Sequence, residues 1–310
     1  MEKAPIVLFV YNRLEHTKKT IEALKKNYGA SDSILYIYSD GPKENSVIEV
    51  NKVRDYIQKV TGFKEIQIVL REKNLGLAAS VIAGVTEVLN QYGRVIVLED
   101  DLVTTKYFLN YMNEALQRYE QTPKVFAVTG YSYFAKGNKY LPETYFAHLT
   151  ESWTWATWKE RWDYFDPEAK GWKKLLEDKK MRKDFDYDNC FGFSQMLYQQ
   201  MEEKSIDSWA VRWAYSVFRQ HGLTLYVNRP LCVNIGFDGS GVHCGTSDRE
   251  EKIELYEGEV QFWPDKVLEE PETRKQICRE MLRQKHKYIL GRVKYYFTHP
   301  SQVFIRLRRI

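Results

Sequence analysis

The chain has 310 residues, of which 44% are apolar, and it carries 46 Lys and Arg against 42 Asp and Glu. This composition excludes a disordered or fibrous protein, and the length suits one large domain or two smaller ones. No apolar run approaches the roughly 18 residues of a membrane-spanning helix. The first apolar run, residues 4–11, lacks the basic start and the cleavage site of a signal peptide. We therefore expect a cytoplasmic protein.

The cysteines agree with that expectation. They show no C-x-x-C spacing, so the sequence suggests neither a zinc site nor a disulfide framework. A reducing setting fits best. The four are Cys190, Cys232, Cys244 and Cys278.

The positive charge is concentrated at one end. Residues 281–310 contain eight Lys and Arg and no acidic residue, so the rest of the chain carries a net charge of about −4. A nucleic-acid-binding protein would be more uniformly basic, and we expect no nucleic acid as partner. Aromatic and aliphatic residues alternate with the basic ones, which is typical of a segment lying on anionic lipid, here the inner face of the plasma membrane. The alternative is a helix packed on the body with a solvated basic face.

The first 130 residues alternate short apolar runs with amphipathic patterns. Apolar residues on consecutive positions are expected when helices cover both faces of a parallel sheet. Strands that recur roughly every 30 residues with a helix between them predict βαβ units, and hence a doubly wound, mostly parallel α/β sheet. The expected strands are 6–10, 34–38, 66–70, 95–98 and 125–128, and the expected helices are about 15–27, 45–60, 77–91 and 104–119.

The composition changes at about residue 131. Five of the eight Trp lie between 153 and 172, and a Gly-rich loop spans 236–245. We expect an α/β half at 1–130, an aromatic-rich half at 131–263 and a basic helical tail at 264–310. Within the last two we expect a helix at about 206–220, a strand at 224–227 and a final helix at about 273–297.

Charged and amide groups follow each of the first four expected strands. Ligands bind at the carboxyl ends of strands in such sheets, so these residues are the first candidates for a site. No G-x-G-x-x-G or Walker A loop is present at these positions, which disfavours dinucleotide binding and P-loop chemistry. The segments are Tyr11-Asn12-Arg13, Ser39-Asp40-Gly41, residues 71–76 with Arg71 and Asn74, and Glu99-Asp100-Asp101.

The acidic triplet at 99–101 is the sharpest of these signals. Three adjacent carboxylates repel one another unless a cation neutralises them. Mg²⁺ and Mn²⁺ prefer oxygen ligands and commonly join a protein carboxylate to substrate phosphates. The alternative is that Asp100 or Asp101 caps a following helix. The position at a strand end favours a site for a metal and a diphosphate.

Taken together, these segments resemble GT-A glycosyltransferases. Among these the chain is similar to the eukaryotic N-acetylglucosaminyltransferase I family and to sugar transferases of bacterial polysaccharide clusters. The similarity covers residues 4 to about 245 and rests on residues 4–13, 38–41, 71–76 and 97–101 in that order.

The resemblance implies a metal-dependent transfer of a sugar, with inversion, from a nucleotide-sugar donor, expected to be a UDP-sugar. The acceptor would be a hydroxyl of a glycan or of a lipid-linked saccharide, in surface polysaccharide or glycoconjugate synthesis. Asp101 would bind Mn²⁺ or Mg²⁺ directly, and Asp40 would lie at the uracil. The alternative for Arg13 is a surface residue at a helix start, and for Asp40 a β-turn with Gly41. The implied donor-binding residues are Tyr11, Arg13, Asp40, Arg71, Asn74, Glu99 and Asp100.

Asp207 is the candidate catalytic base. An inverting transferase needs a carboxylate that accepts the proton of the attacking hydroxyl. The related eukaryotic enzymes carry Asp-Asp-Trp here, and aligning Trp209 places Ser208 where their base lies. Asp207 would therefore have to act from one position earlier. The alternative is that Asp207 caps its helix.

Aromatic residues and a late histidine complete the candidates. Trp153, Trp155 and Trp209 are expected to bind the acceptor, because aromatic rings cover the apolar faces of sugars. The alternative is ordinary core packing. His243, in the Gly-rich loop, is expected to complete the metal site, although a lone His is more often structural.

Two other functions remain open from the sequence. A nucleotidyltransferase would also combine an α/β sheet with acidic metal ligands, but it should carry a Gly-rich basic loop after the first strand. A sugar-binding module without catalytic activity could share the same fold.

Overall fold

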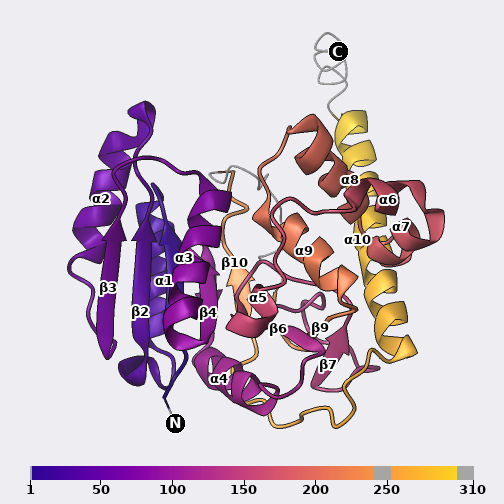
Figure 1. Cartoon of the computed structure of the whole chain (residues 1–310), viewed down its shortest axis with the longest axis horizontal. Helices are drawn as coiled ribbons and strands as arrows, with labels where there is room; N and C mark the ends of the chain where they lie inside the picture. Colours follow the sequence, from indigo (N-terminus) through magenta and orange to yellow (C-terminus); the bar gives the residue numbers. More distant parts are fainter. Residues whose placement is uncertain (1, 240–252, 299–310) are drawn as a thin grey trace.

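A single large sheet runs through most of the chain (Figure 1). The computed structural model describes residues 2–239 and 253–298. The sheet has eight strands in the order β3-β2-β1-β4-β8-β6-β9-β7, and β5 and β10 form a second, two-stranded sheet. The strands are β1 (Ile6–Val10), β2 (Ile34–Ser39), β3 (Glu65–Leu70), β4 (Arg94–Glu99), β5 (Leu102–Thr104), β6 (Val125–Thr129), β7 (Thr144–Ala147), β8 (Trp155–Trp158), β9 (Leu223–Val227) and β10 (Cys232–Asn234).

Strand direction defines the functional edge of this sheet. Strands β3, β2, β1 and β4 are parallel to their neighbours, so their carboxyl ends share one edge. Strand β8 lies antiparallel between β4 and β6, β9 is parallel to β6, and β7 closes the sheet antiparallel to β9. The fold is therefore mixed α/β with a mostly parallel sheet, as the sequence predicts.

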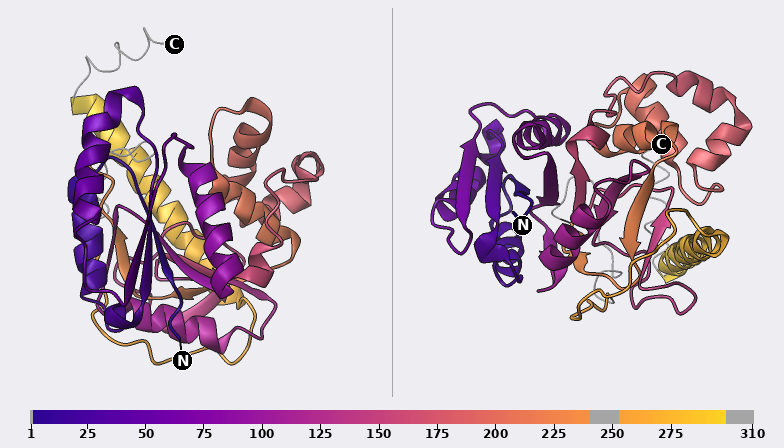
Figure 2. Two further views of the ribbon diagram at one scale, coloured as in Figure 1. Left: turned by 60° about the vertical axis from the view of Figure 1, so that its left-hand side comes forward. Right: turned by 60° about the horizontal axis from the view of Figure 1, so that its bottom comes forward.

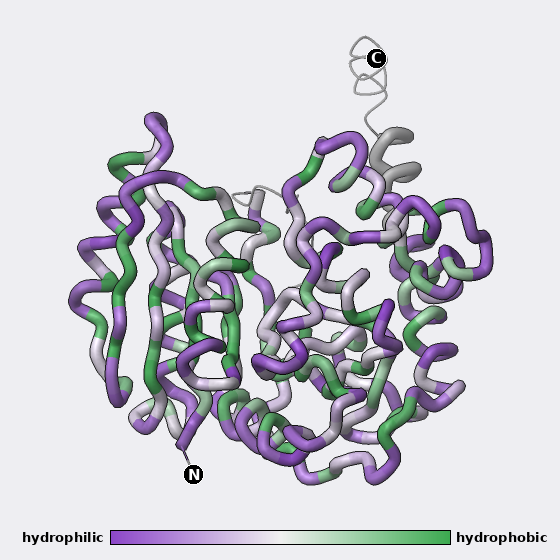
Figure 3. The backbone as a smooth tube through the Cα atoms, viewed as in Figure 1, coloured by the Kyte–Doolittle hydropathy of each residue, from purple (hydrophilic) through white to green (hydrophobic). Residues whose placement is uncertain are grey.

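Helices cover both faces of the sheet (Figure 2). Alternate residues of β1 point to opposite sides: Leu8 packs with α1, α2 and α4, whereas Val7 and Phe9 pack with α3 and α9. The apolar strands of this core are green in Figure 3, and the outer turns of the helices are mostly purple. The helices are α1 (Leu14–Lys25), α2 (Val47–Ile57), α3 (Leu77–Tyr92), α4 (Phe108–Arg118), α5 (Lys159–Trp162), α6 (Trp172–Glu177), α7 (Lys179–Phe185), α8 (Phe193–Tyr198), α9 (Trp209–Arg219) and α10 (Pro271–Thr298).

The expected strands and helices are confirmed, with shifts of a few residues at their ends. The largest shift is in α4, which begins at Phe108 rather than near 104. Residues 102–104 form β5 instead, because they pair with β10, about 130 residues further along the chain. Helices α5–α8 and strands β5, β7, β8 and β10 were not expected. These elements are short, so they carry little periodic signal of their own.

Helix α10 is fastened to the second half of the chain by covalent and ionic contacts. Arg274 on α10 lies 2.8 Å from Glu269 and 3.0 Å from Asp184. Cys278 on the same helix forms a disulfide with Cys190, with 5.5 Å between their Cα atoms. The expectation that the cysteines form no disulfide is therefore wrong, because packing of α10 joins positions 88 residues apart in the sequence.

None of the helices within residues 2–239 and 253–298 combines the length and the hydrophobicity that crossing a bilayer requires.

The disulfide should contribute measurably to stability. A bond that closes a long loop typically adds about 2–4 kcal/mol, because it restricts the unfolded chain. Under non-reducing conditions, Cys190→Ser should lower the free energy of unfolding, measured by urea titration, by that amount, and its urea midpoint should fall accordingly. Wild-type protein treated with reductant is the control and should match the variant. Equal midpoints for the variant and for untreated wild type would contradict the bond.

Candidate functional site

The acidic triplet lies where β4 ends. Glu99 is the last residue of β4, and Asp100 and Asp101 form the turn into β5, each with only 4% of its surface exposed. Arg13, at the start of α1, extends its guanidinium between the two aspartates. Its Nη2 contacts Asp100 and lies 2.8 Å from Asp101 Oδ2. The Arg13 side chain is 18% exposed, so the expected alternative of a simple surface residue is wrong.

Burial strongly affects the acid–base state of Glu99 and Asp100. Burial, followed by the charges of Asp101 and Asp100, raises the pKa of Glu99 to about 8. Burial also raises the pKa of Asp100, although the Arg13 guanidinium opposes that change. A buried group of carboxylates needs a nearby cation, and Arg13 supplies one. The alternative that Asp100 or Asp101 caps a helix is also wrong, since β5 follows them.

A backbone segment after β10 covers this acidic turn. The N–H of Ile235 donates to the carbonyl oxygen of Asp101 at 2.8 Å, and the N–H of Gly236 donates to Asn234 Oδ1 at 2.7 Å. A Cβ at Gly236 would overlap Asp101 Oδ2 and would lie 3.0 Å from Arg13 Nη1. Any other residue here would force the side chain of Asp101 to shift. The Gly-rich run from residue 236 was the sequence signal for this contact.

The oxygen ligands at this turn suit a divalent cation. Mg²⁺ and Mn²⁺ are often held by one or two carboxylates together with substrate phosphates, and Asp100 and Asp101 supply such a pair. The cation would take over the role of Arg13 as counter-charge. Among the described residues, no three His, Cys, Asp or Glu side chains converge into a complete metal site. His243, the other expected ligand, lies outside the described residues.

Asp40 holds the neighbouring part of the edge together. Its carboxylate accepts hydrogen bonds from the backbone N–H groups of Gly41, Leu75 and Gly76, at 2.9–3.0 Å. These bonds fasten the loop after β3 to the end of β2. They include the local bond to Gly41 that the β-turn alternative predicts, and they leave the carboxylate 7% exposed.

The other donor-side candidates also bond within this edge. Asn74 Nδ2 donates to the carbonyl oxygen of Gly41 at 2.7 Å. Arg71 Nη1 donates to Ser80 Oγ at 3.1 Å, and its guanidinium lies over the ring of Tyr38. The hydroxyl of Tyr11 lies 2.7 Å from Ser46 Oγ. The structure therefore groups the candidates from the ends of β1, β2 and β3 with the acidic turn.

Asp207 reaches this edge from the second half of the chain. Its side chain is 63% exposed and lies 3.4 Å from Arg212 Nη2. A Cβ at Gly76, in the loop fastened by Asp40, would lie 3.8 Å from Asp207 Oδ2. The helix cap is Ser208, whose Oγ accepts the N–H of Val211, so the alternative that Asp207 caps α9 is wrong. Asp207 is an exposed carboxylate beside the loop that begins α3.

The sequence itself identifies the family. Residues 6–199, more than half of the chain, match the family described as "Glycosyl transferase family 2". The chain belongs to this family. The mostly parallel sheet with helices on both faces is its GT-A fold.

Three solved structures are similar to this chain. GalNAc-T7 with UDP, GalNAc and Mn²⁺ is 11% identical over 73% of this chain and 42% of its own, with a TM-score of 0.46. S. aureus TarS 1–349 is 11% identical over 74% of this chain and 59% of its own, with a TM-score of 0.43. The mannosyltransferase PcManGT from Pyrobaculum calidifontis, in complex with GDP-Man and Mn²⁺, is 9% identical over 71% of this chain and 74% of its own. Its TM-score is 0.37.

This chain therefore covers less than two thirds of the length of GalNAc-T7 and of TarS 1–349. Comparison with curated proteins gives no match.

The tryptophans expected at the acceptor site lie mainly in the hydrophobic core. Trp155 and Trp209 are 1% and 3% exposed, and their rings stack on each other at 5.0 Å between centroids. Both residues are therefore part of the hydrophobic core, which is the alternative that the sequence left open. Trp153 is only partly buried, against Tyr131 and Phe237. Of the three expected acceptor residues, it alone retains accessible surface.

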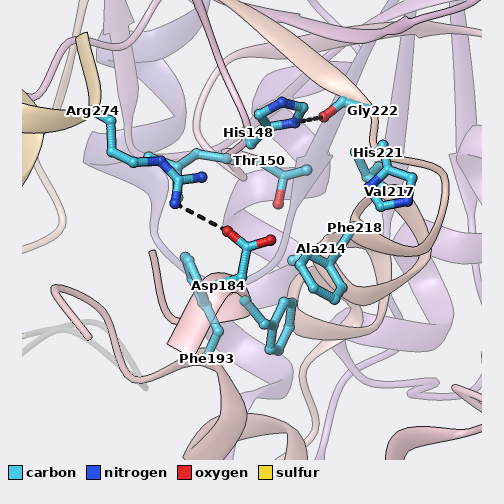
Figure 4. Close-up of a pocket in the computed structure, with 12 residues that line it drawn as sticks. His148, Thr150, Asp184, Phe193, Ala214, Val217, Phe218, His221, Gly222 and Arg274 are labelled. Atoms are coloured by element: carbon cyan, nitrogen blue, oxygen red, sulfur yellow. Dashed lines mark hydrogen bonds and ion pairs between the residues drawn. The ribbon is translucent and has the colours of Figure 1, made fainter. Parts of the chain in front are cut away.

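The pocket drawn in Figure 4 lies away from the acidic turn. It has a volume of about 240 Å³ and is lined by residues of α7, α9 and the start of α10. His148 Nδ1 lies 2.9 Å from the carbonyl oxygen of Gly222 there, and Arg274 bonds to Asp184. Ligand pockets usually measure about 300–1,000 Å³, so this one is small for a nucleotide-sugar. None of the described candidate site residues lines it.

Gly41 offers a direct test of the fastened edge. A Cβ at this position would lie 2.6 Å from the carbonyl oxygen of Lys73, so Gly41→Ala must push the two loops apart. Such overpacking costs about 1–3 kcal/mol, which urea unfolding can measure. Gly192→Ala is the control, because a Cβ there meets nothing within 4 Å. Equal stability of both variants would show that the loops do not meet as described.

Proposed function

We propose that this glycosyltransferase moves a sugar from a UDP-sugar to a hydroxyl of a glycan or a lipid-linked saccharide, in surface polysaccharide or glycoconjugate synthesis. The observation that carries the proposal is the buried Asp100–Asp101 pair at the carboxyl edge, with Arg13 paired to both carboxylates. This combination of carboxylates and a positively charged side chain suits a diphosphate and its cation. The finer likeness to the N-acetylglucosaminyltransferase I family belongs to the same proposal, and so does the inverting outcome that it implies.

The donor would lie along the ends of β1–β4. We assign the diphosphate to Arg13 and the sugar and ribose to Glu99 and Asp100, with Tyr11, Arg71 and Asn74 around the nucleotide. For Asp40 the hydrogen bonds support an indirect role at the base, because its oxygens already accept three backbone N–H groups. It would shape the loop that meets the uracil.

Mn²⁺ or Mg²⁺ would be held by Asp101, with Asp100 beside it. When bound, the cation supplies positive charge that stabilises the diphosphate leaving group. Arg13, released from Asp101, could then turn toward a phosphate oxygen. His243 remains a proposed further ligand.

Asp207 is the proposed base. Its exposure leaves its carboxylate open to an acceptor, and its place beside Gly76 supports a position close to the donor. The carboxylate would take the proton of the acceptor hydroxyl as that oxygen attacks the anomeric carbon. The bond from that carbon to the diphosphate breaks on the opposite face. Trp153 would contribute an aromatic surface to the acceptor, whereas Trp155 and Trp209 would support α9 beneath Asp207.

Replacement of the proposed base separates an enzyme from a sugar-binding module. Asp207→Asn should lower turnover roughly 10²–10⁴-fold, because a general base contributes about that factor, while nucleotide binding stays unchanged. Turnover is measured as release of UDP. Asp163→Asn is the matched control, since Asp163 is similarly exposed and also paired with a basic residue. Unchanged turnover in Asp207→Asn would remove its assignment as the base.

The donor and the metal can be tested by thermal shift. UDP, GDP, CMP and dTDP are each added with and without Mn²⁺. A ligand at 100 times its Kd stabilises by about 2.7 kcal/mol, which raises Tm by several degrees. We expect a shift for UDP that requires Mn²⁺ and that Asp101→Ala abolishes. A full shift in Asp101→Ala would contradict the metal site, and no shift with any nucleotide would favour a sugar-binding module.

The sequence left a nucleotidyltransferase open as a second function. Membership of glycosyl transferase family 2 favours sugar transfer over that reaction.

A further inference from the structure

The second half of α10 extends beyond the folded body. Up to Gln284 the helix is anchored: Ile277 is fully buried, Cys278 is joined to Cys190, and Gln284 Nε2 donates to the carbonyl oxygen of Tyr133 at 3.4 Å. Beyond Gln284, every side chain that the structure describes is exposed. These are Lys285, His286, Lys287, Ile289 and Leu290.

This extension is long for a helical segment whose described side chains are all exposed. The 14 residues from Lys285 to Thr298 span ~21 Å at the helical rise of about 1.5 Å per residue. Helices of about 12–15 residues are marginal in water when they stand alone. A surface that binds the extension would therefore stabilise it, and its side chains indicate the chemistry of that surface.

The extension combines positive charge with exposed apolar groups. From Lys285 to Thr298 the sequence has four Lys and Arg and no acidic residue. Ile289 and Leu290 are 46% and 67% exposed. Anionic lipid attracts the basic side chains and accepts the apolar ones below its headgroups. A nucleic acid would match the charge alone.

The C-terminal end of α10 lies on the same side of the molecule as the candidate active site. In Figures 1 and 2, α10 rises to the side toward which β1–β4 point, the side that carries the acidic turn. The start of α2 stands on the same side of the sheet and exposes Val47 and Ile48, at 41% and 65%. The two helix ends therefore flank the functional edge.

We propose that the end of α10 beyond Gln284 and the start of α2, at Val47 and Ile48, dock the protein on an anionic membrane surface with the carboxyl edge of β1–β4 facing the lipid. One consequence rests on the proposed function: in this orientation the acceptor is a lipid-linked saccharide presented at the membrane surface. The docking itself does not depend on it.

The experiment is co-sedimentation of the full chain with vesicles of phosphatidylcholine and phosphatidylglycerol at 3:1, and with pure phosphatidylcholine vesicles. The test variant carries Lys285→Glu, Lys287→Glu, Ile289→Ser and Leu290→Ser. The matched control carries Lys124→Glu, Lys266→Glu, Phe262→Ser and Leu268→Ser, which makes the same changes at exposed positions outside α2 and outside the end of α10 beyond Gln284.

We expect wild type and control to bind the anionic vesicles, more weakly as salt rises. The test variant should bind at least about 30-fold more weakly, because each Lys near such a surface contributes roughly 1 kcal/mol. Equal binding by test variant and wild type, equal wild-type binding to both vesicle types, or no wild-type binding would each overturn the proposal.

The place of α2 is tested separately. Val47→Ser with Ile48→Ser should weaken vesicle binding by about fivefold or more, since both side chains would leave the lipid. Unchanged binding in this variant would overturn the proposed orientation.

The nucleotide thermal shift, measured on the same variants, distinguishes failure of docking from failure of the proposed function. The α10 variant should retain the full shift with UDP and Mn²⁺. Vesicle binding that requires α10, in a wild type that shows no nucleotide shift, would leave docking standing and remove the transferase proposal.

Discussion

A buried pair of carboxylates that needs a counter-charge is the constraint on which this molecule depends. Asp100 and Asp101 are almost fully enclosed at the end of β4, and Arg13 is the cation that contacts both. Leaving one member of such a group unpaired typically costs several kcal/mol. The arrangement is therefore stable only while a positive charge is present. Arg13 supplies that charge within the chain, and a divalent cation with a diphosphate could supply it in a complex.

The surrounding structure keeps this turn in place from several directions. The pairing of β5 with β10 brings the backbone of Gly236 against Asp101, and the carboxylate of Asp40 fastens the loop after β3 to the end of β2. These are mostly hydrogen bonds to backbone groups, which hold position without depending on long side chains. They produce a rigid edge on which only a few side chains remain free to move.

The second half of the chain contributes to this edge through its aromatic core. The stack of Trp155 on Trp209 fixes the first turn of α9 against the sheet, and Asp207 lies two residues before Trp209. Burying rings of this size contributes several kcal/mol, so the position of α9 is strongly determined. The aromatic residues thus act on the candidate site through packing, and an exposed carboxylate stands at the end of a rigidly held helix.

The sequence by itself determined the elements whose signal is local. The apolar runs at residues 6–10 and 34–38 became β1 and β2, and the polar segments after the strands gathered at one edge, because parallel strands end together. Tertiary structure decided what depends on distant partners. It made Trp155 and Trp209 core residues, joined Cys190 to Cys278, turned residues 102–104 into a strand and gave the helix cap to Ser208. The physical reason is that burial, disulfide formation and strand pairing depend on neighbours remote in the sequence, whereas periodicity registers only adjacent residues.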